Sequence, residues 1–272
     1  MIQITDPQPF QDALDALAVK TILPTTLRTA AMSQLAPAIR ERAFWSSGVT
    51  SAEFLQQAHD TAQQMIEGKI DRATGRQQLD AMREKLGAPS VAEVGKGGGL
   101  TDLWSEARQN VLLDTNVNMA RGYGQWMQGQ NPDILDEWPA QEFLRVSARH
   151  EPRDWPARWQ EAGGKFFPGS ADYPEGRMIA LKNDPIWAEI SRFGNPYPPF
   201  DFNSGMGVGD VDRDEAEKLG LIAPDATQPS QTRGFNQDFQ ITPLVRAANL
   251  IAELVEAFQG TGLLFKDGVF ST

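Results

Sequence analysis

Apolar side chains recur every three or four residues along much of the N-terminal part of the chain, which is the spacing of an amphipathic helix. The pattern predicts one helix over residues 9–22. A second is expected to begin at Thr50-Ser51-Ala52-Glu53, a sequence typical of a capping box. Asp71 is the predicted N-cap of a third helix. Residues 1–100 are therefore expected to form a helical N-terminal region.

The longest stretch of helical spacing covers residues 101–128, with Thr101 as its predicted N-cap. After this helix the period falls to two, which indicates β-strands. The predicted strands are residues 143–148, 164–168 and 177–182, with a weaker one at Met206-Gly207-Val208. Short strands separated by turns favour a small antiparallel sheet, so residues 101–222 are expected to combine the long helix with a sheet core.

Residues 194–209 are dense in proline and glycine, and Pro198-Pro199 is expected to fix the shape of this irregular loop. Six acidic residues follow between Asp201 and Glu217. This acidic run is expected to be a solvated loop and helix start, with a cation site or a site for a basic partner as the alternative.

The C-terminal part, residues 223–272, predicts a polar linker followed by an amphipathic helix over residues 242–259. The apolar face of this helix comprises Leu244, Ala248, Ile251, Val255 and Phe258. Such a helix either packs on the body of the protein or docks on a partner, and the sequence favours neither. Together these patterns predict an α+β fold with a mainly helical N-terminal half, a small antiparallel sheet with long loops, and a C-terminal helix.

Charge and composition narrow the function classes. The chain of 272 residues has 25 Lys and Arg against 36 Asp and Glu, a net charge of −11. Because DNA affinity comes largely from basic side chains that neutralise phosphates, a DNA-binding accessory is a disfavoured reading. No apolar run approaches the roughly 20 residues of a membrane span, and the N-terminus lacks the pattern of a secretory signal. We expect no membrane association and at most weak, indirect contact with nucleic acid.

Residues able to carry catalysis are few. The chain has two histidines and no cysteine, so neither a metal site nor a cofactor is expected. The best acid–base set combines His150 with Glu151 and Asp154, with Arg149 and Arg153 to hold an anion. Mixed charges this close in sequence are more typical of a solvated turn with ion pairs.

Several short motifs occur in a characteristic order. Lys20 precedes Leu23-Pro24-Thr25, and the long helix carries Thr115-Asn116 followed by Ala120 and Gly124. Further along the chain come Arg149-His150, Gly164-Lys165-Phe166, Asp184-Pro185-Ile186-Trp187 and Pro198-Pro199. In this order and spacing, the chain resembles the phage Mu-type minor head proteins, also called head morphogenesis proteins, over residues 8–218.

The chain departs from the family at two places. A Cys-Arg-Cys sequence usually follows the Pro-Pro loop, whereas this chain has Phe200-Asp201-Phe202-Asn203-Ser204-Gly205-Met206. Any metal or disulfide role of those cysteines is therefore absent here. The basic sequence that usually precedes the histidine is reduced to Val146-Ser147-Ala148-Arg149. The resemblance is thus to a divergent member.

The resemblance implies a structural role rather than an enzymatic one. It implies a virion head component that acts in capsid assembly, binds the portal protein inside the procapsid and accompanies DNA packaging or ejection. Scaffold and major capsid protein are further implied partners, with the host cytoplasm as the location during assembly. The residues expected to carry the motif or bind partners are Thr115, Asn116, Arg149, His150, Trp187, Pro198, Pro199, Leu244, Ile251, Val255 and Phe258. The alternative is a hydrolase or nucleotide-transfer enzyme that uses His150, Arg149 and nearby carboxylates.

Overall fold

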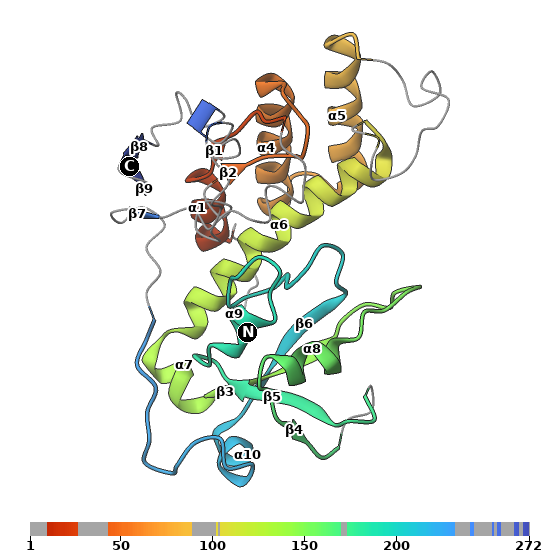
Figure 1. Cartoon of the computed structure of the whole chain (residues 1–272). Helices are drawn as coiled ribbons and strands as arrows, with labels where there is room; N and C mark the ends of the chain where they lie inside the picture. The colour runs from red at the N-terminus through yellow and green to blue at the C-terminus, as the bar shows by residue number, and fades with distance from the viewer. Residues whose placement is uncertain are drawn as a thin grey trace, which may run out of the picture. The chain divides into compact units, whose positions relative to one another are not determined.

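The computed structural model describes residues 10–26, 43–88, 102, 104–169 and 173–231, and toward the C-terminus residues 240–241, 252, 255–256, 264–266 and 269–271. The predicted α+β class is confirmed, because helices dominate the first half and a four-stranded antiparallel sheet follows (Figure 1). The chain divides into unit 1, Met1–Arg121 with Gly234–Thr272, and unit 2, Gly122–Arg233. The sequence-based division at residues 100 and 222 stays a prediction.

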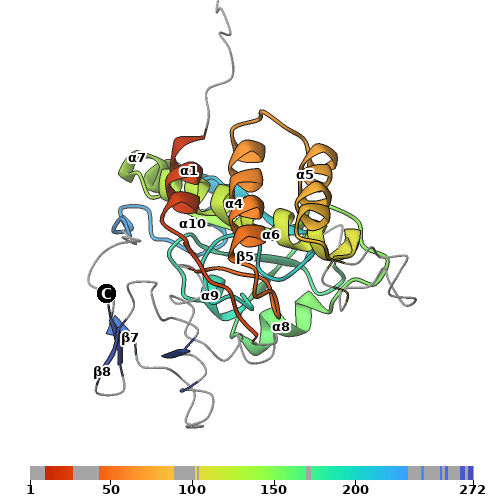
Figure 2. The same ribbon diagram turned by 90° about the horizontal axis from the view of Figure 1, so that it is seen from above.

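Unit 1 contains helices α1, α4 and α5, the first part of α6, and a short parallel pair of strands. Helix α4 contacts both α1 and α5 and lies between them (Figure 2). The bounds are α1 Gln11–Ala18, β1 Thr21–Ile22, β2 Ala43–Phe44, α4 Ala52–Ile66, α5 Arg72–Lys85 and α6 Glu106–Gly129.

The N-caps of these helices test the sequence analysis directly. Asp71 caps α5 as predicted, since its carboxylate accepts a hydrogen bond from the Thr74 amide at 2.8 Å. The spacing of the predicted capping box, Thr50-Ser51-Ala52-Glu53, would make Thr50 the cap of α4. The cap is instead the next residue, because the Ser51 hydroxyl accepts from the Phe54 amide at 3.1 Å. Helix α6 begins at Glu106 rather than at 101, and the Ser105 hydroxyl accepts from the Arg108 amide. Thr101 lies outside the described residues.

Unit 2 is built on a sheet with the strand order β4-β5-β3-β6, in which all neighbours are antiparallel. Strand β3 therefore lies between β5 and β6. The bounds are α7 Pro132–Glu137, β3 Ala140–Arg145, α8 Trp155–Glu161, β4 Phe166–Phe167, β5 Arg177–Leu181, α9 Ile186–Glu189, β6 Met206–Val211 and α10 Arg213–Lys218.

Strand β3 lies three residues earlier than the predicted strand over 143–148. The ladder ends because the amides of Val146 and Ser147 both donate to one carbonyl, that of Gly205, at 2.9 and 3.1 Å. Two successive donors on a single acceptor break the alternation of a strand. The pattern over Val146-Ser147-Ala148 thus belongs to an exposed turn.

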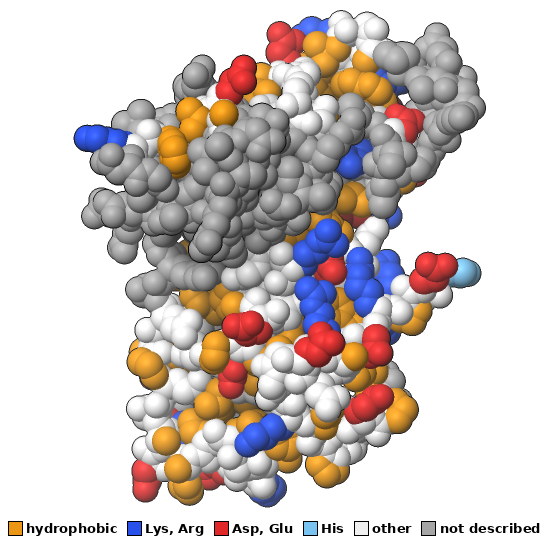
Figure 3. Space-filling model, in the orientation of Figure 1, with side chains coloured by type: hydrophobic (Ala, Val, Ile, Leu, Met, Phe, Trp, Pro, Cys, Tyr) orange, Lys and Arg blue, Asp and Glu red, His pale blue; other side chains and the backbone are white. Residues whose placement is uncertain are grey.

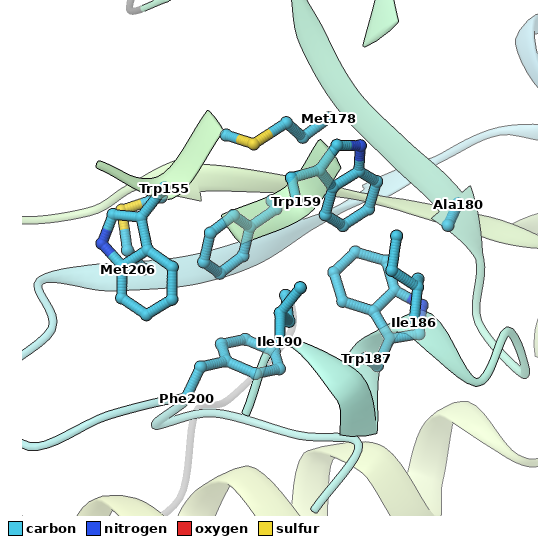
Figure 4. Packing of buried hydrophobic residues seen from close by; sticks show 10 residues of the cluster. Trp155, Trp159, Met178, Ala180, Ile186, Trp187, Ile190, Phe200 and Met206 are labelled. Carbon is cyan, nitrogen blue, oxygen red and sulfur yellow. The ribbon is translucent and has the colours of Figure 1, made fainter. Parts of the chain in front are cut away.

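The two faces of the sheet bury different side chains. One face carries Phe143, Met178 and Met206 against three tryptophans. Figure 4 shows Ile186 and Trp187 of α9 on this side, together with Ile190, which caps that helix. The other face carries Ala140, Ile179 and Val211 against Ala216 of α10 and Ile222. Alternate residues of each strand point to opposite faces, which explains the division.

The C-terminal residues include a small sheet that the sequence did not predict. Strands β7 (Gln240–Ile241), β8 (Leu264–Lys266) and β9 (Val269–Ser271) pair antiparallel in the order β7-β9-β8. Of the predicted helix 242–259, only Ala252, Val255 and Glu256 are described, and these three are helical. Leu244, Ile251 and Phe258 lie outside the described residues. No helix in the described part of the chain is long and apolar enough to cross a membrane.

Candidate functional site

Two motif segments that lie far apart in sequence meet inside unit 1. The Lys20 ammonium donates to the Asn116 side-chain oxygen at 3.3 Å, across a separation of 96 positions. The other end of the Asn116 amide donates to the Leu112 carbonyl at 2.9 Å, and Asn116 is buried in α6. Its neighbour Thr115 is half-buried. The pair of motifs therefore ties the segment after α1 to the long helix.

Trp187 is a core residue rather than a surface contact. It is fully buried on the aromatic face of the sheet, and its indole N–H donates to the Leu181 carbonyl at 2.7 Å. Asp184, three residues before Trp187, supports the tryptophan, because its carboxylate accepts from the Ile186 amide at the start of α9. The Asp-Pro-x-Trp motif thus fixes α9 to the end of β5.

The loop around Pro198-Pro199 is ordered by buried groups. Its Pro198–Pro199 peptide bond is cis. Asn195 is buried, accepts from the Ser191 hydroxyl at 2.9 Å and donates to the Tyr197 carbonyl at 2.6 Å. The Pro198 carbonyl also approaches α6 closely, since a Cβ added to Gly122 would lie 1.9 Å from that oxygen. Glycine at 122 therefore lets this loop rest on the helix backbone.

Arg149 and His150 lie on an exposed segment between β3 and α8. None of the described hydrogen bonds or ion pairs joins His150 to Arg149, Glu151 or Asp154. The Asp154 carboxylate instead accepts from the Ala157 amide and caps α8. An assembled acid–base set, with its members in hydrogen-bond contact, is thus not formed by these side chains in the described geometry.

A cluster that sequence analysis missed lies around Asp201. This carboxylate was expected to be solvated as part of the acidic run, but it is buried. Three arginines approach it, with Nε of Arg153 at 3.3 Å, Nη1 of Arg158 at 3.2 Å and Nη1 of Arg192 at 3.8 Å. Arg153 also donates to the Phe202 carbonyl at 2.8 Å. We call these four residues, Asp201, Arg153, Arg158 and Arg192, the arginine cluster.

The sequence offered two signals for the cluster: Arg153, expected to hold an anion, and the position of Asp201. Asp201 stands in the loop after Pro198-Pro199, between two aromatic residues, Phe200 and Phe202. Phe200 is fully buried, which carries its neighbour inward. The arginines come from two other segments, one around α8 and one after α9, so their approach could not be seen from spacing along the chain.

A second group of charged side chains lies on the face of the sheet that packs against α10 and has a structural role. Arg177 of β5 donates to Glu142 of β3 at 2.7 and 2.9 Å and also to Glu215 of α10. These hydrogen bonds, first with Glu142 and then with Glu215, raise the pKa of Arg177 above its usual value. The three charges join α10 to the sheet.

The segment after α10 belongs to unit 2 and packs on the rest of that unit. Gln228 donates to the Pro139 carbonyl at 2.6 Å, and the Ser230 hydroxyl donates to the Gln130 carbonyl at 2.7 Å. A shallow depression beside it is lined by Met127, Gln128, Gln130, Asn131, Ile134, Ser230 and Gln231. The side chains that line this depression include no charged group and no histidine, so they provide no general acid or base.

Among the described residues, no group of three or more His, Asp or Glu side chains could hold a metal ion. No protein-family model, characterised protein or solved structure matches this chain.

Proposed function

We propose that the chain is a phage minor head protein that acts in head morphogenesis and binds the portal protein inside the procapsid. The observation that carries the proposal is the meeting of motif segments distant in sequence, as Lys20 and Asn116 do through their hydrogen bond. In this contact each residue satisfies the polar group of the other, so the two motif segments support one local structure.

The packing of two other motifs supports a structural role. Trp187 is in the core, and Pro198 lies on the backbone of Gly122. Residues used in this way position helices and loops and do not contact a substrate. This is the behaviour expected when the motifs define a scaffold whose surface binds other head proteins.

Co-expression with the portal protein encoded beside this gene tests the proposal. We expect a stable complex that survives size-exclusion chromatography at moderate salt. The matched control is the same chain with an unrelated portal protein. A well-folded chain that co-purifies with neither portal protein would contradict the proposal.

The C-terminal residues are the first part to remove from the full chain. Deleting residues 240–272 takes away β7, β8 and β9 together with the predicted amphipathic helix, but it leaves Gln228 and Ser230 on unit 2. We expect this variant to stay soluble and to bind the portal protein more weakly. An insoluble variant would show that the deleted residues belong to the body of the protein, and the docking role would be lost.

The enzyme alternative gives a different result. If His150 acts in hydrolysis or nucleotide transfer, His150→Ala abolishes turnover while the circular dichroism spectrum is unchanged. Since His150 is exposed, the structural proposal predicts that this substitution changes neither stability nor portal binding by a measurable amount.

A further inference from the structure

The arginine cluster concentrates positive charge in an acidic protein. Three guanidinium groups lie within 4 Å of one carboxylate, so the cluster carries a formal charge of 3 − 1 = +2. Three more charged residues lie close by in sequence: Arg149, Glu151 and Asp154. With them the charge is 4 − 3 = +1, in a chain whose net charge is −11. The sign of the charge is therefore reversed locally.

The arginines remain accessible while the carboxylate does not. The Asp201 side chain is 5% exposed, whereas those of Arg153, Arg158 and Arg192 are 41%, 31% and 44% exposed. In the view of Figure 3, Lys and Arg side chains gather around an acidic side chain next to the part of unit 2 that carries α8. A solute approaching this surface meets guanidinium groups before it meets the carboxylate.

Aromatic rings hold two of the guanidinium groups in place. Arg158 lies over the Trp155 ring at 5.1 Å, and Arg192 lies over the Phe202 ring at 5.6 Å. Trp155 is fully buried at the start of α8 and provides a rigid base. Stacking restricts a guanidinium plane without using its N–H groups, so less entropy is lost when a ligand is bound.

Hydrogen-bond donors remain on the cluster. Arg153 and Arg158 have five N–H donors each. Within the described part of the chain, the hydrogen bonds of these two side chains are one from Arg153 to the Phe202 carbonyl and one from Arg158 to Asp201. Most of the N–H donors of these two arginines are therefore left for solvent or for an anion. The contacts to Phe202 and Asp201 already hold both side chains in place.

We propose that the arginine cluster is a binding site for a phosphate group. Guanidinium forks match the oxygens of phosphate in pairs, and the three guanidinium groups carry more N–H donors than the one carboxylate of Asp201 accepts. The phosphate comes either from a nucleic-acid backbone or from a free phosphate compound. The proposal does not depend on the portal-binding role.

Titration of the full chain with inorganic phosphate, at constant ionic strength set with chloride, tests the site. We expect the Nε–Hε NMR signals of Arg153, Arg158 and Arg192 to shift and saturate, while that of Arg72, an exposed arginine paired with Asp114, does not. Saturating phosphate that shifts none of the three signals overturns the proposal. This measurement uses the unaltered chain and does not depend on whether a variant folds.

The double variant Arg153→Gln and Arg192→Gln keeps Arg158 to compensate Asp201. Losing two charge-assisted contacts is expected to lower phosphate affinity at least about tenfold. Arg72→Gln is the matched control and should stay within about twofold of the unaltered chain. A folded double variant that binds phosphate as tightly as the control overturns the proposal.

A labelled DNA duplex of about 20 base pairs at about 50 mM salt distinguishes the two sources. Binding to a nucleic-acid backbone predicts that the duplex displaces phosphate, and that the slope of log affinity against log salt is about −0.9 for each phosphate contacted. Phosphate binding without duplex binding assigns the site to a free phosphate compound. In either case the double variant must lose the binding.

Discussion

The sheet of unit 2 and the α4–α5 helix pair of unit 1 are stabilised by different kinds of contact. In unit 2, the sheet packs on an aromatic cluster in which Phe143 lies 5.1 Å from Trp155 and 5.1 Å from Phe200, between ring centroids. In unit 1, the pair of helices α4 and α5 meets around Gly75 and Leu79, beside a chain of polar side chains. Thr61 donates to Gln78 at 2.8 Å, and Gln78 donates to Gln64 at 3.1 Å.

The difference has an energetic consequence. A buried aromatic side chain removes a large apolar area from water, whereas a hydrogen bond between neutral side chains contributes only about 0.5–1.5 kcal/mol net. Helix α5 buries only Gly75 and Leu79, so less apolar area is removed from water along this helix than in the aromatic cluster. Substitutions in the aromatic cluster should cost more stability than substitutions at the caps of α4 and α5.

The largest effect is expected at Trp187. Replacing it with alanine removes a fully buried indole and its hydrogen bond to Leu181, so Trp187→Ala should lower the free energy of unfolding by roughly 3–5 kcal/mol. Denaturant unfolding followed by circular dichroism measures this. Trp138→Ala is the matched control, because Trp138 is exposed on the same unit, and it should change stability by about 0.5 kcal/mol or less. Equal losses in the two variants would contradict the burial of Trp187 as the cause of its larger effect.

A pair of glycines in α6 tests the contact between that helix and the loop of Pro198. A methyl group at 122 would lie 1.9 Å from the Pro198 carbonyl oxygen, so Gly122→Ala must displace the backbone and should cost roughly 1–3 kcal/mol. At Gly129 the nearest atom is 3.9 Å away, and alanine is the better helix former. Gly129→Ala should leave the free energy of unfolding unchanged or raise it by up to about 1 kcal/mol. A loss at 129 as large as that at 122 would contradict this account.

How much of the structure followed from the sequence depends on how local its causes are. Helical spacing predicted α4 and α5, and Asp71 was found as a cap because cap and helix are adjacent in sequence. The arginine cluster was missed because its members are distant in sequence. Asp201 contacts Arg158 and Arg153, which lie 43 and 48 positions earlier, and also Arg192. Asp201 is buried, although the acidic residues that follow it suggested a solvated loop. The strands β7, β8 and β9 were missed because two or three residues are too short to show a period.

The cap of α4 is a case in which local reasoning came within one residue. Thr50 and Ser51 both carry a hydroxyl, and only the backbone geometry decides between them. Since Ser51 accepts from the Phe54 amide, Ser51→Ala should lower the free energy of unfolding by about 1 kcal/mol. Thr50→Ala, the exposed neighbour, should have an effect below about 0.5 kcal/mol. The reverse order in denaturant unfolding would restore Thr50 as the cap.

The smallest effect concerns the charge on the cap of α5. Hydrogen bonds from the backbone and the side chain of Thr74 hold the pKa of Asp71 below its usual value. Because the pKa is lower in the folded chain than in the unfolded one, the ionised carboxylate stabilises the fold above the unfolded pKa of about 4, and this contribution is lost as the pH falls through the folded pKa.

Asn is an equally good cap but has no charge to interact with the helix dipole. The difference in melting temperature between the unaltered chain and Asp71→Asn should therefore favour the unaltered chain at about pH 6 and shrink toward zero at about pH 2.5. Other carboxylates titrate in both proteins and cancel in the difference. A difference that stays constant over this range would mean that the charge of Asp71 contributes nothing and that its cap acts through the hydrogen bond alone.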